Sequence, residues 1–480
     1  MAISQSKCME RPTDPLYVLP LELVGYIFHL WLLDSIYPHT NYSHSQLPVL
    51  LCLVSKSWRN FVYANPLLWA HVFLDVSQGA VPTLHALRKR LERSQSAPLF
   101  LDILVGEQPD RDALRLLLAE SSRFRHVTLG VFDLSWCNDI PTQGFTQLSK
   151  LTVHTGFQIP TRVDELSAVF SSTPRLRYVK WLSTGDPGLV GVNGHQLHFL
   201  DLTIFYLPVT RLLEVLAACP NLRDLVITFQ GEHEYTPILP RERMLFPELR
   251  SLVLDGTGHL ACILRSVQAP LLSCLDIKWW DHNSREYGLE ALQSLLADSP
   301  HLEQIALRRF LETEEELITI ITNNKNLFRL TVAAERWQTS FITHKTFQLL
   351  TRQAHGKYAL PHLEKLEIRG ALDVADEVVL RMIESRMAPP DNVGHSPHSG
   401  GARSLRSICL DGCKPMAEES ISRLESICQE SGLEAEGTFA SPIQIPAFTV
   451  VTDVRTSYFA YLFSSGAVIL WLCKLLLGRR

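Results

Sequence analysis

The sequence predicts an α/β protein in which a small, all-helical module precedes a long solenoid of repeated strand–helix units. Three observations predict this fold. A spacing of apolar residues, L-x-x-L-x-L with conservative replacements, recurs eleven times in near register. Segments between the recurrences place apolar residues three and four positions apart, as one face of a helix requires. Only 9 of the first 80 residues are charged, against 86 of the remaining 400, which indicates a separate N-terminal module.

Composition excludes several classes of protein. The chain has 480 residues, about three times the ~150 of an ordinary domain, so several domains or an elongated array are expected. Its net charge of −5 leaves no basic surplus for phosphates, which argues against a nucleic-acid partner. Ten cysteines without a C-x-x-C pair predict neither a disulfide framework nor a zinc cluster. The first fifteen residues lack the apolar core of a secretory signal, so the predicted location is the cytoplasm or nucleus.

The N-terminal module is predicted over residues 15–75, after a tail at 1–14. A first helix follows the tail, and a polar stretch at 37–46 separates it from a second predicted helix over 47–64. A third short element around Trp69 leads into a strand. The two helices carry more apolar residues than they can bury against each other. We therefore expect apolar residues on the surface of this module.

The solenoid is predicted over residues 97–430, with parallel strands on its concave face and helices on its convex face. Within the repeated spacing the period is two, so the leucines point to one side, as in a short strand. Most intervals fall near the 20–29 residues of a leucine-rich repeat. The eleven repeats begin at Phe124, Leu148, Leu176, Leu197, Leu222, Leu249, Leu272, Leu302, Leu327, Leu363 and Leu405. Helical periodicity between them is clearest at 211–218, 289–297, 313–322 and 375–384.

Two segments interrupt or follow the predicted array. A Pro/Gly/Ser-rich loop near 388–402 is expected to be an insertion, and residues 431–457 are expected to leave the array. A hydrophobic segment at 454–480 contains 18 residues without a charge, Thr456–Cys473. Three interpretations of it stay open: a membrane anchor through 456–477, a soluble amphipathic or core element, or a cap on the last repeat.

Three stretches of the N-terminal module carry a family resemblance. They are L-P-L-E-L-V-G-Y-I-F at 19–28, L-C-L-V-S-K-S-W-R at 51–59 and N-P-L-L-W at 65–69. Together they resemble the F-box, although the polar stretch between the first two helices is longer than usual. F-box modules followed by leucine-rich repeats are a recurrent pairing. The resemblance implies docking on the Skp-type adaptor of a cullin–RING ubiquitin ligase, while the repeats recruit a protein substrate.

Carried over by position, the resemblance names the residues of the adaptor interface. An alternative stays open, in which the same residues pack the module onto the first repeats. The residues that would make or support the interface are Leu19, Pro20, Leu23, Ile27, Leu50, Val54 and Trp58.

The substrate-binding surface is predicted on the concave face, at positions that alternate with the leucines. These positions include aromatic residues and both signs of charge, which suits a protein partner. Trp279 and Trp280 are the leading candidates for a binding hot spot, and a role for one or both in the core stays open. The candidates are Tyr178, Lys180, Phe199, Asp201, Asp224, Asp276, Lys278, Trp279, Trp280, Arg308, Lys365 and Arg369.

Catalytic motifs have no convincing representative in this sequence. Gly256-x-Gly258-x-x-Ala261 imitates a dinucleotide-binding turn, but it lies within the repeat series and its strand-to-strand interval is too short. Two H-x-x-H pairs lack further metal ligands nearby. We therefore expect no catalytic residue, no cofactor and no metal. The predicted function is that of a non-catalytic substrate-recognition subunit of a Skp–cullin–F-box ligase; the alternative is a scaffold or membrane-tethered interaction protein without a ligase role.

Overall fold

The computed structural model describes most of the chain, and two compact units divide it. The described residues up to Phe73 belong to the first unit, and the described residues from Leu74 onward belong to the second. The described residues are 14–33, 46–76, 84–106, 110–131, 144–155, 169–183, 192–205, 208–229, 243–257, 259–280, 285–334, 341–353, 358–370, 372–387, 404–411 and 416–437.

The described part of the N-terminal unit consists of short helices, as its apolar spacing predicts. They are α1 (Pro15–Val18), α2 (Leu21–Leu33), α4 (Leu47–Val54), α5 (Lys56–Tyr63) and α6 (Pro66–Trp69). The expectation of one helix over 47–64 is wrong. Ser55 adopts an extended conformation (φ −160°, ψ 173°) and its hydroxyl accepts a hydrogen bond from the Trp58 amide at 3.2 Å. This N-cap ends one helix and starts the next, because it satisfies an amide that has no partner within α5.

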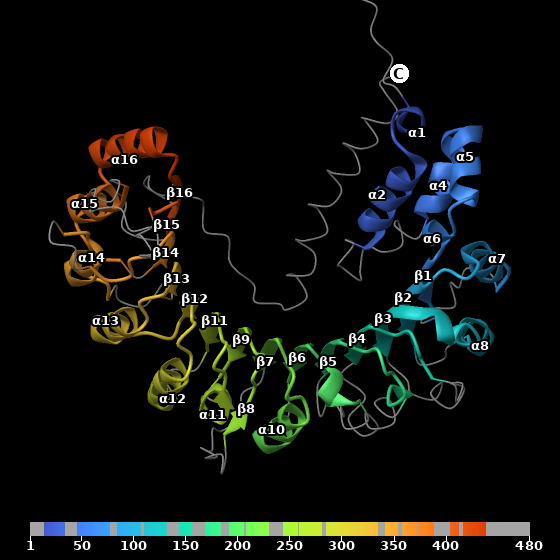
Figure 1. Ribbon diagram of the computed structural model, residues 1–480, viewed down its shortest axis with the longest axis horizontal. Helices are drawn as coiled ribbons and strands as arrows, with labels where there is room; N and C mark the ends of the chain where they lie inside the picture. The colour runs from blue at the N-terminus through green and yellow to red at the C-terminus, as the bar shows by residue number, and fades with distance from the viewer. Residues whose placement is uncertain are drawn as a thin grey trace, which may run out of the picture. The chain divides into compact units, whose positions relative to one another are not determined.

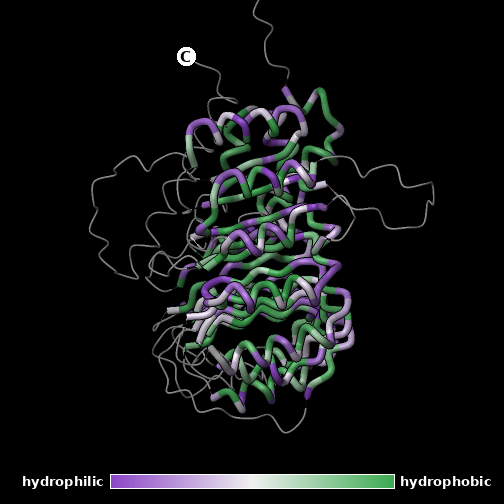
Figure 2. The backbone as a smooth tube through the Cα atoms, turned by 90° about the vertical axis from the view of Figure 1, so that its left-hand side faces the viewer, coloured by the Kyte–Doolittle hydropathy of each residue, from purple (hydrophilic) through white to green (hydrophobic). Residues whose placement is uncertain are grey.

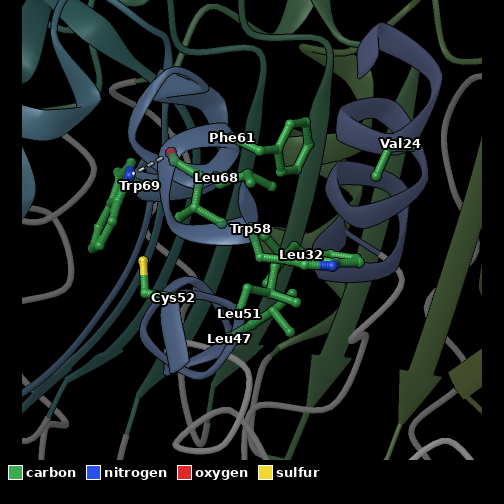
Figure 3. Packing of buried hydrophobic residues seen from close by; sticks show 10 residues of the cluster. Val24, Leu32, Leu47, Leu51, Cys52, Trp58, Phe61, Leu68 and Trp69 are labelled. Carbon is green, nitrogen blue, oxygen red and sulfur yellow. Dashed lines mark hydrogen bonds between the residues drawn. The ribbon is translucent and has the colours of Figure 1, made fainter. Parts of the chain in front are cut away.

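A small hydrophobic core, with two tryptophans in it, holds these helices together (Figure 3). Trp58 contacts Phe28 edge-on, with ring centroids 5.8 Å apart, and its indole N–H donates to both carboxylate oxygens of Asp14 at 3.1 and 3.2 Å. The indole N–H of Trp69 donates to the Val62 carbonyl at 3.0 Å. Each buried tryptophan therefore satisfies its polar atom while filling the core with a large ring.

One long sheet of fourteen strands runs from β1 (His71–Asp75) to β16 (Glu434–Gly437) in chain order. From β2 onward every neighbouring pair is parallel. The short strands β8 (Met244–Leu245) and β10 (Val267–Gln268) pair separately. The strands between β1 and β16 are β2 (Leu99–Val105), β3 (Phe124–Val131), β4 (Lys150–Thr155), β5 (Tyr178–Ser183), β6 (Phe199–Ile204), β7 (Asp224–Phe229), β9 (Ser251–Gly256), β11 (Cys274–Trp279), β12 (Gln304–Arg308), β13 (Arg329–Ala333), β14 (Lys365–Arg369) and β15 (Ser407–Asp411).

All eleven predicted repeats coincide with strands of this sheet, from β3 to β15. Their leucines are in register and buried, as Leu225, Leu252 and Leu275 on neighbouring strands illustrate. Hydrophobic residues recur in each successive layer of the stack (Figure 2). No single strand–helix unit can bury its own leucines, so stacking of similar units provides the core. The predicted α/β class with a long parallel sheet of repeated units is confirmed.

Helices cover one face of the sheet in the repeat unit, and the strands line the other face (Figure 1). The four predicted helical segments each coincide with one of these helices. The helices are α7 (Leu84–Ser94), α8 (Arg111–Leu118), α10 (Val209–Ala217), α11 (His259–Ser266), α12 (Arg285–Ala297), α13 (Glu314–Asn323), α14 (His344–Leu350), α15 (Asp376–Met387) and α16 (Glu418–Ser431), with 3₁₀ turns at Ser121–Arg123 and Gly194–Gln196.

Several expectations concern the ends of the array. Residues 431–457 do not leave it at once, because β16 still pairs with β15. This strand lacks the leucine spacing and joins the sheet through backbone hydrogen bonds, which need no particular side chain. Residues 1–13, the loop near 388–402 and the hydrophobic segment at 454–480 lie outside the described residues. Within the described ranges, no helix has the length and apolar character needed to cross a bilayer.

Candidate functional site

Exposed apolar residues gather in the N-terminal unit. Of the eighteen large hydrophobic residues exposed in the described part of the chain, thirteen lie between residues 17 and 63. We call these thirteen the N-terminal apolar surface. They are Tyr17, Val18, Leu19, Leu21, Leu23, Tyr26, Ile27, Leu30, Val49, Leu50, Leu53, Val54 and Tyr63.

Two helices of this unit each have an apolar stripe besides the one that faces the core. In α2, Val24 and Leu32 are buried, whereas Leu23, Ile27 and Leu30 are exposed at helical spacing. The same holds in α4, where Leu51 is buried and Leu50 and Val54 are exposed. A helix that only packed inside its own unit would need a single stripe. The second stripe is therefore the feature that requires an explanation.

Six of the seven residues that the family resemblance places at an adaptor interface are exposed. Leu19, Leu23, Ile27, Leu50 and Val54 expose 39% to 57% of their surface, and Pro20 is exposed as well. Trp58 is the exception, at 4%. A partner cannot reach its ring, so a direct contact through Trp58 is corrected to a supporting role in the core.

The second candidate surface is the face of the repeat sheet that carries no helix, which we call the inner face. Its residues alternate with the buried leucines, and the strand register aligns them in rows. One row contains Tyr178, Phe199 and Asp224, and the next contains Lys180 and Asp201. Further along the sheet, Lys278 aligns with Arg308. Strand register thus brings together residues that are far apart in the sequence.

The two adjacent tryptophans have opposite environments. Trp279 is 1% exposed and packs edge-on against Phe310, with ring centroids 5.3 Å apart. A Cβ atom at Gly288 would lie only 2.7 Å from its ring, so that helix position needs glycine. The prediction of Trp279 as a surface contact is wrong. The alternation along β11 predicts this burial, since Trp279 follows Leu275 and Ile277 at a spacing of two and so points to the same side.

Trp280 is 47% exposed at the end of β11. Its indole N–H donates to the Asp255 carboxylate. The ammonium of Lys278 and the guanidinium of Arg309 lie 4.2 and 4.3 Å from the ring centroid. These cation–π contacts hold the ring in one orientation.

Charged residues of the inner face are mostly paired across neighbouring strands. Lys180 lies 2.8 Å from Asp201, and the Arg308 guanidinium donates to both oxygens of Asp276 at 2.6 and 2.7 Å. Within β14, Glu367 accepts a hydrogen bond from Arg369 at 2.5 Å, which raises the pKa of that guanidinium. Such pairs fix side-chain positions and leave a surface of mixed sign.

Lys150 was not among the predicted residues, although the repeat contains the signal for it. It stands directly before the second leucine of its repeat, as Tyr178 and Phe199 do, and the register aligns all three. Its ammonium lies 4.5 Å from the centroid of the Tyr178 ring. Burial lowers the pKa of Lys150, the nearby charge of Lys180 lowers it further, and Asp102 opposes the shift.

The turn that imitates a dinucleotide site is part of the repeat series. Gly256 ends β9, with φ at +156°, and a Cβ atom there would lie 2.6 Å from Phe229 Cβ. This close approach of neighbouring strands explains the glycine without a bound phosphate. In the described ranges no three His, Cys, Asp or Glu side chains converge as metal ligands would.

Comparison with known proteins adds little to this geometry. No family model matches the chain, and no curated protein matches it. A solved structure described as the crystal structure of the Rad7 and Elc1 complex in yeast is 14% identical, with a TM-score of 0.31. The match covers 85% of this chain and 96% of that chain. A likeness at this level carries no argument about function.

Proposed function

We propose that this chain is a non-catalytic substrate-recognition subunit of a Skp–cullin–F-box ubiquitin ligase. The N-terminal unit docks on a Skp-type adaptor, and the inner face of the repeat sheet binds a protein substrate. The observation that carries the proposal is the N-terminal apolar surface, which includes five of the positions that the F-box resemblance assigns to the adaptor.

The physical argument is the cost of leaving this surface in water. Monomeric soluble proteins rarely expose contiguous apolar patches larger than a few hundred Å², and larger patches are typical of interaction sites. Burial of a leucine side chain contributes roughly 1.5–3 kcal/mol relative to full exposure. Several half-exposed leucines on neighbouring helices therefore provide a large part of the binding free energy of a protein interface.

The proposed mechanism is proximity. Binding of adaptor and substrate to one chain converts ubiquitin transfer into a reaction between tethered partners, with an effective concentration in the mM range for short connections. Transfer chemistry belongs to the partner proteins, and this chain contributes position.

Adaptor capture tests the docking surface. We expect the double substitution Leu23→Asp and Leu50→Asp to lower adaptor affinity at least about thirtyfold, since loss of a binding hot spot costs about 2 kcal/mol or more. Both side chains are about half exposed, so the substitutions leave the core of the unit intact. The measurement is co-purification of the full chain with a Skp-type adaptor and a cullin.

Leu245→Asp is the matched control, because Leu245 is 54% exposed but lies in the repeat unit. It should leave adaptor capture unchanged. Equal capture by the double variant and the wild type would contradict the proposal. Capture of the adaptor without the cullin would instead identify a scaffold.

A further inference from the structure

Three residues on consecutive strands form an ordered row on the inner face. The register aligns Lys150 of β4 with Tyr178 of β5, and Tyr178 with Phe199 of β6. The Tyr178 and Phe199 rings stack with centroids 4.0 Å apart and an interplanar angle of 6°. Because β5 lies between β4 and β6, Lys150 and Phe199 contact opposite faces of the Tyr178 ring. These two contacts hold the Tyr178 ring in place between Lys150 and Phe199.

Of the two lysines near this row, only one forms an ion pair with a described residue. Lys180, two residues after Tyr178 on the same face, pairs with Asp201 at 2.8 Å. The ion pairs of the described chain include none for Lys150. The two ammonium groups are close enough for the charge of Lys180 to lower the pKa of Lys150. An anion bound beside Lys150 would relieve this repulsion.

We propose that Lys150, Lys180 and Tyr178 form a carboxylate-binding subsite, which takes an aspartate or glutamate side chain of a peptide. The Tyr178–Phe199 stack supports an apolar residue next to that acid in the same peptide. The identification of this peptide as a ubiquitination substrate rests on the proposed function, whereas the subsite itself rests on the inner face alone.

Charge favours a carboxylate over a phosphate. A phosphorylated side chain carries about −1.5 to −2 at pH 7. Asp201 pairs with Lys180 at 2.8 Å, whereas Lys150 forms no ion pair with a described residue and Asp102 acts on it by charge alone. The singly charged carboxylate can pair directly with the Lys150 ammonium, and a second negative charge would be repelled by Asp201 and by Asp102.

The test uses immobilised full-length chain and synthetic nonapeptide pools with blocked ends. The central residue is glutamate, glutamine or phosphoserine, and the flanking positions are randomised among uncharged residues. We expect the wild type to retain the glutamate pool about tenfold better than the glutamine pool, as one charge-assisted hydrogen bond in a half-buried site provides. Added salt should reduce this preference.

Matched variants locate the effect. Lys150→Gln should abolish the preference for glutamate, and Lys150→Arg should keep it, because the charge is retained. Lys325→Gln is the control: Lys325 is exposed in the turn between α13 and β13 and is not part of the inner face. It should behave as the wild type. Far-UV circular dichroism of each variant excludes unfolding as the cause.

Each outcome decides the proposal. It is overturned if the wild type shows no preference for glutamate, or if Lys150→Gln retains that preference. Selection of the phosphoserine pool alone would identify a phosphopeptide site and also overturn it. Adaptor capture by the same variants separates the two proposals. Glutamate selection without adaptor capture would leave this subsite standing and remove the ligase role.

Discussion

At the scale of single residues, two buried charges hold neighbouring repeats together. Glu314, at the start of α13, is 6% exposed and accepts hydrogen bonds from the amides and hydroxyls of Thr343 and Thr346 at 2.6–3.0 Å. It therefore caps the N-terminus of α14 from another repeat. Arg386 is 1% exposed and donates to the carbonyls of Leu350, Ala359 and Leu360. Burial lowers its pKa to about 10, so the guanidinium stays charged at neutral pH.

The Glu314 carboxylate makes stability depend on pH. Burial acts to raise its pKa, but the four hydrogen bonds outweigh burial and lower it. Its contribution is therefore present above the pKa of an unfolded glutamate, about 4.3, and is lost as pH falls through the lower folded-state pKa. We expect Glu314→Gln to reduce the free energy of unfolding by about 1–3 kcal/mol at pH 7.

Urea unfolding at pH 7 and at pH 3, followed by far-UV circular dichroism, measures this difference. The difference should shrink at the lower pH, because below about pH 4.3 the unfolded chain binds a proton at Glu314 more readily than the folded protein does. Glu315→Gln is the control. Glu315 is exposed and forms only a 3.6 Å pair with Lys345, so its loss should cost less than about 1 kcal/mol. A pH-independent effect of Glu314→Gln would contradict this account.

At the scale of secondary-structure elements, the break at Ser55 shapes the N-terminal unit. A continuous helix over 47–64 would align the apolar residues of α4 and α5 along one axis. The extended Ser55 instead lets α5 bury Trp58, Phe61 and Val62, while Leu50 and Val54 of α4 stay exposed. A capped break therefore separates the core positions of α5 from the surface positions of α4.

Loss of this cap should loosen α5. Ser55→Ala removes the hydroxyl that accepts from the Trp58 amide, at a cost of about 1 kcal/mol. Hydrogen-exchange mass spectrometry should show about fivefold faster exchange over residues 56–63, because a loss of about 1 kcal/mol in local stability corresponds to about a fivefold change in exchange rate. Ser55→Asp keeps an acceptor and should keep wild-type protection. Unchanged exchange in Ser55→Ala would show that the cap does not stabilise the helix.

At the scale of the whole molecule, stability of the repeat unit depends on contacts between neighbours. Leu254 of β9 is fully buried, and its strand pairs with β7 and β11. In a stacked array each unit contacts only its neighbours, so damage at one strand stays local to first order. The N-terminal unit is a separate compact body, so adaptor docking should not respond to a change in the array.

Leu254→Ala tests this organisation. The cavity should cost about 2–5 kcal/mol in urea unfolding. Hydrogen exchange should accelerate at β7, β9 and β11 and stay unchanged at β2, β3, β15 and β16. Adaptor capture should equal that of the wild type. Uniformly faster exchange along the sheet would instead indicate one cooperative unit.

Amino-acid order alone predicts the repeat architecture. A spacing of two with large apolar residues, repeated eleven times, can be satisfied only by strands that bury one side, and each of these repeats forms a strand. The strand β16 was not predicted, because it carries no leucine spacing and joins the sheet through backbone hydrogen bonds. The same alternation predicts the positions of two residues that were misplaced or missed. Trp279 lies two residues after Ile277 and therefore points into the core with the leucines, whereas Lys150 directly precedes a leucine and therefore points to the surface.

Long-range packing determined the remaining features. In α2 and α4 nearly every residue is apolar, so composition cannot tell which leucines face the core; the arrangement of α2, α4 and α5 around Trp58 does. Likewise, Glu314 lies in an acidic run that resembles any helix start, and only the approach of Thr343 and Thr346 makes it a buried cap. Local pattern specifies which segments become strands and helices. Which side of each helix is left exposed depends on partners that are distant along the chain.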